Sequence, residues 1–220
     1  RLGLSATPYR EDQKEHIIYS LLGDPVVQYK LMDFVKKGIL TPPIVKIVKI
    51  PLIDKCNSYQ ECKFLAYSNE YANNVIADII TKAEKPVLVL FKEISQLNNV
   101  SEILRAKNMD FAVLTGKDDL EKRDQIIQQF NMGKIQILLA STIFDEGVDI
   151  PNIKSLVLAS GGKSKIKLLQ RIGRSLRKAN GKDRVVIYDI AHGIRYFSQH
   201  LQNRITLYQE EGIPFVEETR

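Results

Sequence analysis

The sequence is poor in the residues from which metal centres and disulfide scaffolds are built. It has no tryptophan, three histidines and two cysteines among 220 residues. Cys56 and Cys62 do not have a usual zinc spacing and are too few for a disulfide scaffold, so we expect free thiols in a reducing cytoplasm and no metal site. The histidines are dispersed, and we interpret His16, His192 and His200 as structural or surface groups.

Long apolar runs are also absent. No stretch approaches the length that crosses a membrane, so we expect no membrane partner. We expect a cytoplasmic protein, associated with the nucleoid or, if a phage encodes it, located in the host cytoplasm. Hydrophobic residues make up 44% of the chain and charged residues 26%, which is typical of a globular protein and excludes a disordered one.

These residues contain no phosphate-binding loop of the form G-x-x-x-x-G-K-[ST]. Gly162, Lys163 and Ser164 match its end, but the leading glycine would be residue 157, which is Val157. Residues 189–192 resemble an acidic DExH box only faintly, because Ile190 stands where its glutamate would be. We therefore expect that this stretch of chain alone hydrolyses no nucleoside triphosphate.

Positive charge is concentrated in one segment. The formal net charge of the chain is +6, whereas residues 161–184 hold nine Lys or Arg and one Asp, a net of +8. The remaining residues are therefore close to neutral. A basic segment within a near-neutral chain indicates a surface for a polyanion, and the alternative is a solvated helix face.

Short apolar runs alternate with amphipathic segments over residues 86–190. The runs predict strands at 87–91, 111–114, 135–141, 155–160 and 184–190, with helices at 95–107, 120–130 and 165–178. Before them we expect helices at 11–22, 31–37 and 57–83 and a strand at 44–52. This pattern indicates an α/β fold with a mostly parallel central sheet flanked by helices. Ligands of such sheets bind beyond the carboxyl ends of the strands, so the loops after each strand are where a site is expected.

The most informative motif is QRIGRSLR, at residues 170–177. In a helix, 100° per residue places Arg174 and Arg177 within about 40° of Gln170, with Arg171 elsewhere. Gly173 lets a backbone or a phosphate approach closely. Two guanidinium forks and an amide on one stripe suit a triphosphate that loses its γ-phosphate, and the alternative is an arginine-rich surface helix without a ligand.

A second motif is STIFDEGVDIP, at residues 141–151. The predicted strand before it delivers Ser141 and Thr142 to a loop, where short hydroxyls can bind nucleic-acid phosphates. Gly147 permits close approach, and Asp149 can accept a hydrogen bond from a ribose hydroxyl. The alternative is that the acidic residues merely cap the next turn.

QRIGRSLR resembles motif VI of the C-terminal core domain of superfamily 2 helicases, Q-x-x-G-R-x-x-R, and STIFDEGVDIP resembles their motif V. Further resemblances follow in the family's order: LGLSATPYR at 2–10 to motif III, VLVLFKE at 87–93 to motif IV, and Leu114-Thr115-Gly116 to the short motif after it. The segments TPYREDQKEHIIYSLLGDPV and KKGILTPP resemble the branch with excision-repair, restriction-motor and phage recombination helicases.

The resemblance implies a RecA-like three-layer domain and a division of the chain into four parts. Residues 1–8 would end a first RecA-like domain, 9–52 would connect, 53–205 would form the second RecA-like domain, and 206–220 would be a C-terminal tail. ATP with Mg²⁺ would be held mainly by the first domain of the same protein, which these residues do not include.

The resemblance also implies the roles of single residues. Arg174 and Arg177 would be arginine fingers, with Gln170 beside them, and Gly147, Asp149 and Gly173 would contact ATP. Nucleic acid, with DNA favoured over RNA, would be contacted by Lys92, Thr115, Gly116, Ser141 and Thr142. The alternatives are a nucleic-acid-binding module that has lost the motor and a motor subunit of a restriction system.

Overall fold

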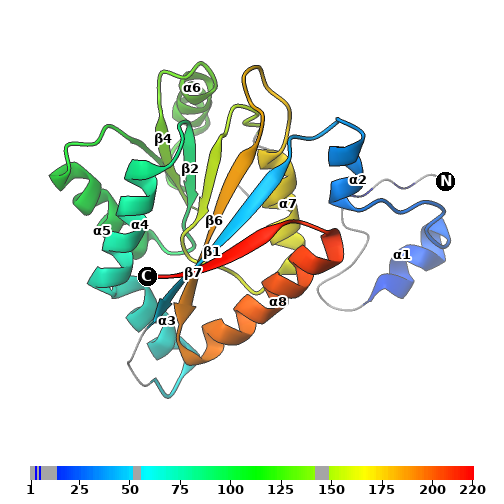
Figure 1. Ribbon diagram of the computed structural model, residues 1–220, viewed down its shortest axis with the longest axis horizontal. Coiled ribbons are helices and arrows are strands. Elements are labelled where there is room, and N and C mark those ends of the chain that lie inside the picture. The colour runs from blue at the N-terminus through cyan, green and yellow to red at the C-terminus, as the bar shows by residue number, and fades with distance from the viewer. Residues whose placement is uncertain (1–2, 4, 6–13, 52–55, 142–148) are drawn as a thin grey trace.

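The strands form one parallel sheet with helices on both faces (Figure 1). In this computed structural model the described residues are 3, 5, 14–51, 56–141 and 149–220. The sheet has seven strands in the order β3-β4-β2-β5-β6-β1-β7, and every pair is parallel. The strands are β1 (Pro43–Pro51), β2 (Val87–Leu90), β3 (Ala112–Leu114), β4 (Ile137–Ala140), β5 (Ser155–Leu158), β6 (Val185–Gly193) and β7 (Phe215–Thr219).

The helices connect the strands and cover the sheet. They are α1 (Glu15–Leu22), α2 (Leu31–Lys36), α3 (Tyr59–Ser68), α4 (Glu70–Lys82), α5 (Ile94–Ala106), α6 (Leu120–Asn131), α7 (Lys165–Ser175) and α8 (Arg195–Glu211). In Figure 1, α3, α4 and α5 lie on one side of the sheet, and α2, α7 and α8 lie on the other. None of the helices in the described part of the chain is both long and apolar enough to span a membrane.

Each strand at the centre of the sheet contributes side chains to two separate hydrophobic cores, because successive side chains along a strand point to opposite faces. In β2, Val87 and Val89 pack in the core under α4 and α5. Leu88 and Leu90 pack in the core under α6, α7 and α8. Burial on both faces explains why these strands are uninterrupted apolar runs, and it confirms the predicted α/β class.

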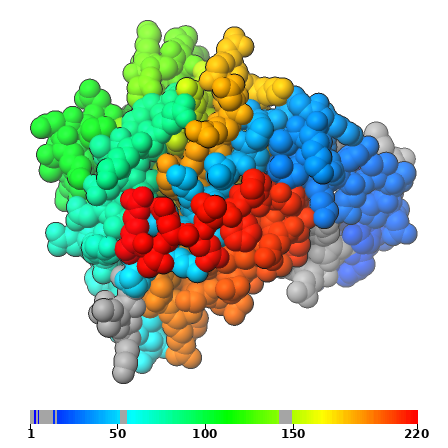
Figure 2. All heavy atoms as spheres, viewed as in Figure 1, coloured from blue at the N-terminus to red at the C-terminus, as the bar shows by residue number. Residues whose placement is uncertain are grey.

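Two predicted segments differ from the structure in their extent. The helix expected over 57–83 is broken at Asn69, whose side chain accepts a hydrogen bond from the Ala72 N–H (2.8 Å) and so begins α4. Residues 206–220, expected as a tail, complete α8 and form β7, which pairs with β1. In Figure 2 these residues (orange to red) lie side by side on the surface.

The prediction of two free thiols is wrong. Cys56 and Cys62 form a disulfide, with their Cα atoms 5.2 Å apart. Because α3 begins at Tyr59, its first turn brings Cys62 back beside Cys56. Two cysteines are too few for a disulfide scaffold, but they are enough for one local disulfide across the start of a helix. The two cysteines therefore give no support for a reducing compartment.

A buried imidazole predicts acid sensitivity of the fold. His192 is 2% exposed, between Tyr67 and Phe197, and burial lowers its pKa to about 4. Between pH 6.5 and 4, His192 is therefore protonated in the unfolded chain but neutral in the folded chain. As the pH is lowered through this range, the free energy of unfolding decreases. We expect His192→Phe to remove about 2 kcal/mol of the loss between pH 7 and 4.5, measured by denaturant titration at both pH values.

The control for this prediction is His16→Gln, because the His16 side chain is exposed. It should leave the pH dependence unchanged. If His192→Phe and the parent chain lose the same free energy on acidification, the buried imidazole is not the cause.

Candidate functional site

The predicted site residues lie at two opposite edges of the sheet, not at one. Lys92, Thr115 and Ser141 follow β2, β3 and β4 and therefore lie at the carboxyl edge. Arg177 forms an antiparallel bridge with Leu40, which precedes β1, and so lies at the amino edge. The expectation that the site gathers at the carboxyl ends of the strands is thus wrong for the arginine. The candidate residues are therefore divided between the two edges of the sheet.

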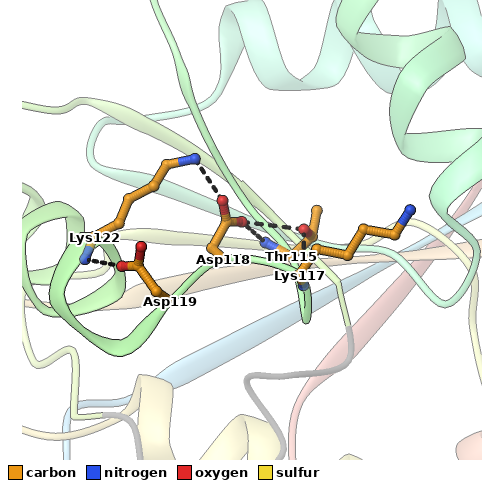
Figure 3. A network of polar contacts seen from close by, with 5 residues as sticks. All are labelled: Thr115, Lys117, Asp118, Asp119 and Lys122. Carbon is orange, nitrogen blue, oxygen red and sulfur yellow. Dashed lines mark hydrogen bonds and ion pairs between the residues drawn. The ribbon is translucent and has the colours of Figure 1, made fainter.

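Thr115 belongs to a tight turn held by Asp118 (Figure 3). The Asp118 carboxylate accepts from the Thr115 N–H (2.7 Å) and hydroxyl (3.1 Å), and it forms an ion pair with Lys122. The pKa of Asp118 is lowered most by the hydrogen bond from Lys122 and next by the hydrogen bond from the Thr115 N–H. Gly116 is exposed at the tip of this turn, where a Cβ would contact nothing within 4 Å. The turn presents Gly116 and the exposed Lys117 to the exterior.

Buried polar groups join the other loops of the carboxyl edge. The Ser141 N–H donates to the Leu114 carbonyl (3.1 Å), which brings the loops after β3 and β4 together. The Lys92 N–H donates to Ser160 Oγ (2.8 Å), and this hydroxyl donates to Gln96 Oε1 (2.7 Å). The loop after β2 is therefore tied to the loop after β5. Sequence reasoning missed Ser160 and Gln96, because their pairing joins residues 64 positions apart.

Aromatic and basic side chains surround Lys92. Its Nζ donates to the Tyr59 hydroxyl (3.4 Å), and the Tyr59 ring contacts His200 with ring centroids 6.1 Å apart. Burial, then the charges of Arg204, Lys92 and Lys163, lower the pKa of His200. Sequence analysis did not single out Tyr59 or Lys163 as site residues, since α3, α8 and the loop after β5 converge only in the fold.

Helix α7 carries the middle of the basic segment. Ser164 caps it by accepting from the Lys167 N–H (3.2 Å), and Leu168 and Ile172 anchor it in the core. Gln170, Arg171, Gly173 and Arg174 are partly exposed on the remaining faces. A Cβ at Gly173 would contact nothing within 4 Å in the described chain, so a group from outside can approach there.

The helix ends at Ser175, earlier than the predicted residue 178. The Leu176 carbonyl accepts from the Thr41 N–H (2.8 Å), which replaces the next helical hydrogen bond with one to the segment before β1. Arg177 therefore does not share a helix face with Gln170 and Arg174, and that part of the spacing argument is wrong.

Arg177 instead forms an ion pair with Asp149, at the end of the motif V segment. Their side chains are 49% and 63% exposed. Asn131 Nδ2 donates to the Asp149 carbonyl (3.2 Å) and so links this residue to the end of α6. The structure thus brings together two residues that the sequence assigned to one nucleotide. Thr142 and Gly147, like most of residues 1–8, lie outside the described residues.

A buried ion pair positions the start of α7. Arg204 of α8 donates from Nε to Asp189 Oδ2 (2.8 Å) and from Nη1 to the Gly162 carbonyl (3.2 Å). The Tyr208 hydroxyl donates to the same carboxylate oxygen (2.8 Å). Gly161 has φ +56, and a Cβ there would approach Arg204 Nη1 to 3.1 Å, so this turn requires glycine. Asp189 is therefore a structural residue, not part of an acidic box.

Among the described residues, no three His, Cys, Asp or Glu side chains are grouped so that they could hold a metal ion.

The sheet order and the motifs define a RecA-like helicase domain, and comparison with known proteins agrees. Residues 71–179 match the family described as the helicase conserved C-terminal domain. A protein named as a helicase in Sulfolobus islandicus filamentous virus is 32% identical over 96% of this chain and 41% of its own length. The DNA 3'-5' translocase XPB2 of Sulfurisphaera tokodaii is 26% identical over 88% of this chain and 53% of its own length.

A solved structure gives the same result. The crystal structure of T4 UvsW superposes with a TM-score of 0.67 and 26% identity, over 81% of this chain and 41% of that one. The chain therefore carries the C-terminal RecA-like core domain of a superfamily 2 helicase, of the branch predicted from its sequence. It spans about half or less of the length of these relatives.

The buried ion pair predicts a large loss of stability when one partner is removed. Arg204→Met leaves the Asp189 carboxylate uncompensated in the interior, and we expect a loss on the order of 3–5 kcal/mol in the free energy of unfolding. Denaturant titration measures it. The matched control is Lys49→Met, which removes an ion pair with Glu217 whose side chains are 43% and 36% exposed. This control should cost less than about 1 kcal/mol, and equal losses in the two variants would contradict the assignment.

Proposed function

We propose that this chain is the C-terminal motor domain of an ATP-dependent helicase or translocase that acts on nucleic acid, with DNA favoured over RNA. The observation that carries the proposal is the separation of the candidate residues. Arg177 and Asp149 lie at the amino edge, and Lys92, Thr115 and Ser141 lie at the carboxyl edge. A motor needs separate surfaces for its nucleotide and its track, and motif V connects the two.

The nucleotide surface is proposed at the amino edge. Arg177 is half-exposed, and the Asp149 carboxylate with which it forms an ion pair is exposed to solvent. An exposed ion pair of this kind stabilises the fold by less than about 1 kcal/mol. A triphosphate offers more charge, so Arg177 can exchange Asp149 for phosphate oxygens, which frees Asp149 to accept from the ribose. Arg174, with Gln170, would approach the phosphates from α7. The other RecA-like domain would hold Mg²⁺ and most of the phosphate contacts.

The nucleic-acid surface is proposed at the carboxyl edge. Exposed Gly116 and Lys117, the Lys92 ammonium and the nearby Lys163 present backbone groups and positive charge that suit a phosphate backbone. Tyr59 adds a half-buried ring that can stack on a base. DNA is favoured because the Sulfurisphaera relative is named a DNA translocase.

Arginine substitutions in the full-length enzyme test the nucleotide surface. Arg174→Ala or Arg177→Ala should lower kcat at least about 10²-fold, because a guanidinium fork stabilises charge that develops on the γ-phosphate. Nucleotide Kd should change much less, since the benefit belongs to the transition state. Replacement by Lys should rescue poorly, because a point charge cannot reproduce the fork. Single-turnover hydrolysis and nucleotide titration measure the two quantities.

Arg171→Ala is the control on the same helix, because Arg171 lies about 100° around α7 from Gln170. It should leave single-turnover hydrolysis largely intact. Equal losses at positions 171, 174 and 177 would mean that the segment acts only as diffuse positive charge.

Salt dependence tests the nucleic-acid surface. Affinity of the full-length protein for single-stranded DNA should fall steeply between about 50 and 200 mM salt, and Lys92→Ala and Lys163→Ala should each reduce the slope of log K against log salt by about 1 or less. Lys134→Ala, at an exposed position just before β4 on the amino edge, is the control and should not change the slope. Fluorescence anisotropy measures the affinities with DNA and RNA of one sequence. A slope that no carboxyl-edge variant alters would place the nucleic acid elsewhere.

A further inference from the structure

Lys182 makes three short contacts that the proposed mechanism does not use. It lies between α7 and β6, and its side chain is buried although its neighbours Gly181 and Asp183 are exposed. Its Nζ donates to the carbonyl oxygens of Pro151 (2.6 Å), Ser175 (2.6 Å) and Arg177 (2.9 Å). One ammonium group therefore joins the end of motif V to the end of motif VI.

The chemistry of this arrangement fits an ammonium closely. An ammonium has three N–H donors, and each of the three carbonyls takes one. Two of these carbonyls lie at the end of α7, where helical partners are missing and the helix dipole is negative. Burial opposes the charge and lowers the pKa of Lys182 to about 8. A neutral amine would have two donors for three acceptors, so the contact set is complete only in the charged form.

We propose that Lys182 is a positioning residue that sets the spacing between Asp149 and Arg177. Pro151 lies two residues beyond Asp149, and the third carbonyl belongs to Arg177 itself. The ammonium fixes both backbones from one atom, while the exposed Arg177 side chain remains able to exchange partners. The inference rests on the proposed role of Arg177 at the nucleotide.

Lys85 offers a matched comparison at the same edge of the sheet. Its Nζ donates to the carbonyls of Ile80 (2.8 Å), Thr81 (2.7 Å) and Ala83 (2.9 Å), at the end of α4. Burial lowers the pKa of this lysine too. The two lysines thus close helix ends in the same way and line one common cavity, but the three carbonyls that Lys85 binds belong to neither motif.

The test uses the full-length enzyme with Lys182→Met and Lys85→Met, which keep an apolar side chain and remove the donors. Both should lower the melting temperature, whereas only Lys182→Met should lower kcat, by about 10- to 100-fold, since small misplacements of catalytic groups have effects of this size. Lys182→Arg, which keeps the charge and several donors, should recover part of kcat. Equal kcat values for Lys182→Met and Lys85→Met would overturn the proposal.

A double-mutant cycle separates positioning from general damage. If Lys182 acts through Arg177, Lys182→Met in an Arg177→Ala background should change kcat less than about twofold. If the kcat losses of the two single variants multiply in the double variant, the positioning proposal is overturned, while Arg177 keeps its proposed role as an arginine finger. Full turnover in Arg177→Ala alone would instead overturn the proposed function, and the positioning role with it. Lys182→Gln, which retains two donors, replaces Lys182→Met in the cycle if the latter does not fold.

Discussion

Burial of a parallel sheet on both faces is the constraint from which the arrangement of this domain follows. Helices occupy the faces, so ligands can reach backbone and polar side chains only at the two edges. Every loop that leaves a strand is at the carboxyl edge, and every segment that enters one is at the amino edge. Of the motif V segment, Ser141 follows β4 at the carboxyl edge, and residues 149–151 precede β5 at the amino edge. A single motif can therefore serve two ligands without either ligand crossing the sheet.

The helix between these edges is held at both ends by buried cations. Arg204 binds the carbonyl of Gly162 just before α7 begins, and Lys182 binds carbonyls where it ends. Both cations are buried, and their hydrogen bonds go to backbone carbonyls and to the buried Asp189 carboxylate. The charge of Lys182 orients backbone, whereas the Arg177 side chain in the same basic segment, residues 161–184, is exposed. The segment's charge thus has two functions that its composition alone does not separate.

Sequence periodicity was sufficient for strands β1 to β6, but not for β7, for the end of α7 or for the break between α3 and α4. Apolar runs such as 87–91 are determined by burial on two faces, which is visible in the residues themselves. The end of α7 depends on Thr41 and Lys182, which reach it from other parts of the chain, and no local signal marks Ser175. The break at Asn69 did carry a local signal, a capping side chain, and could have been predicted. The ion pair of Arg177 with Asp149 joins two separate motifs, which only the folding of the chain brings together.

The position of β1 has a consequence for the order of folding. This strand, near residue 47, pairs with β6 near residue 189 on one side and with β7 near residue 217 on the other. Both pairings close longer loops than the pairings of β2, whose residue Val87 is paired with Ile137 of β4 and Ser155 of β5. During synthesis β1 emerges before both of its partner strands, so its edges stay unpaired in the interval and are open to pairing with another nascent chain. Lys46 and Lys49, on opposite faces of the strand, place charge along a segment that is otherwise apolar.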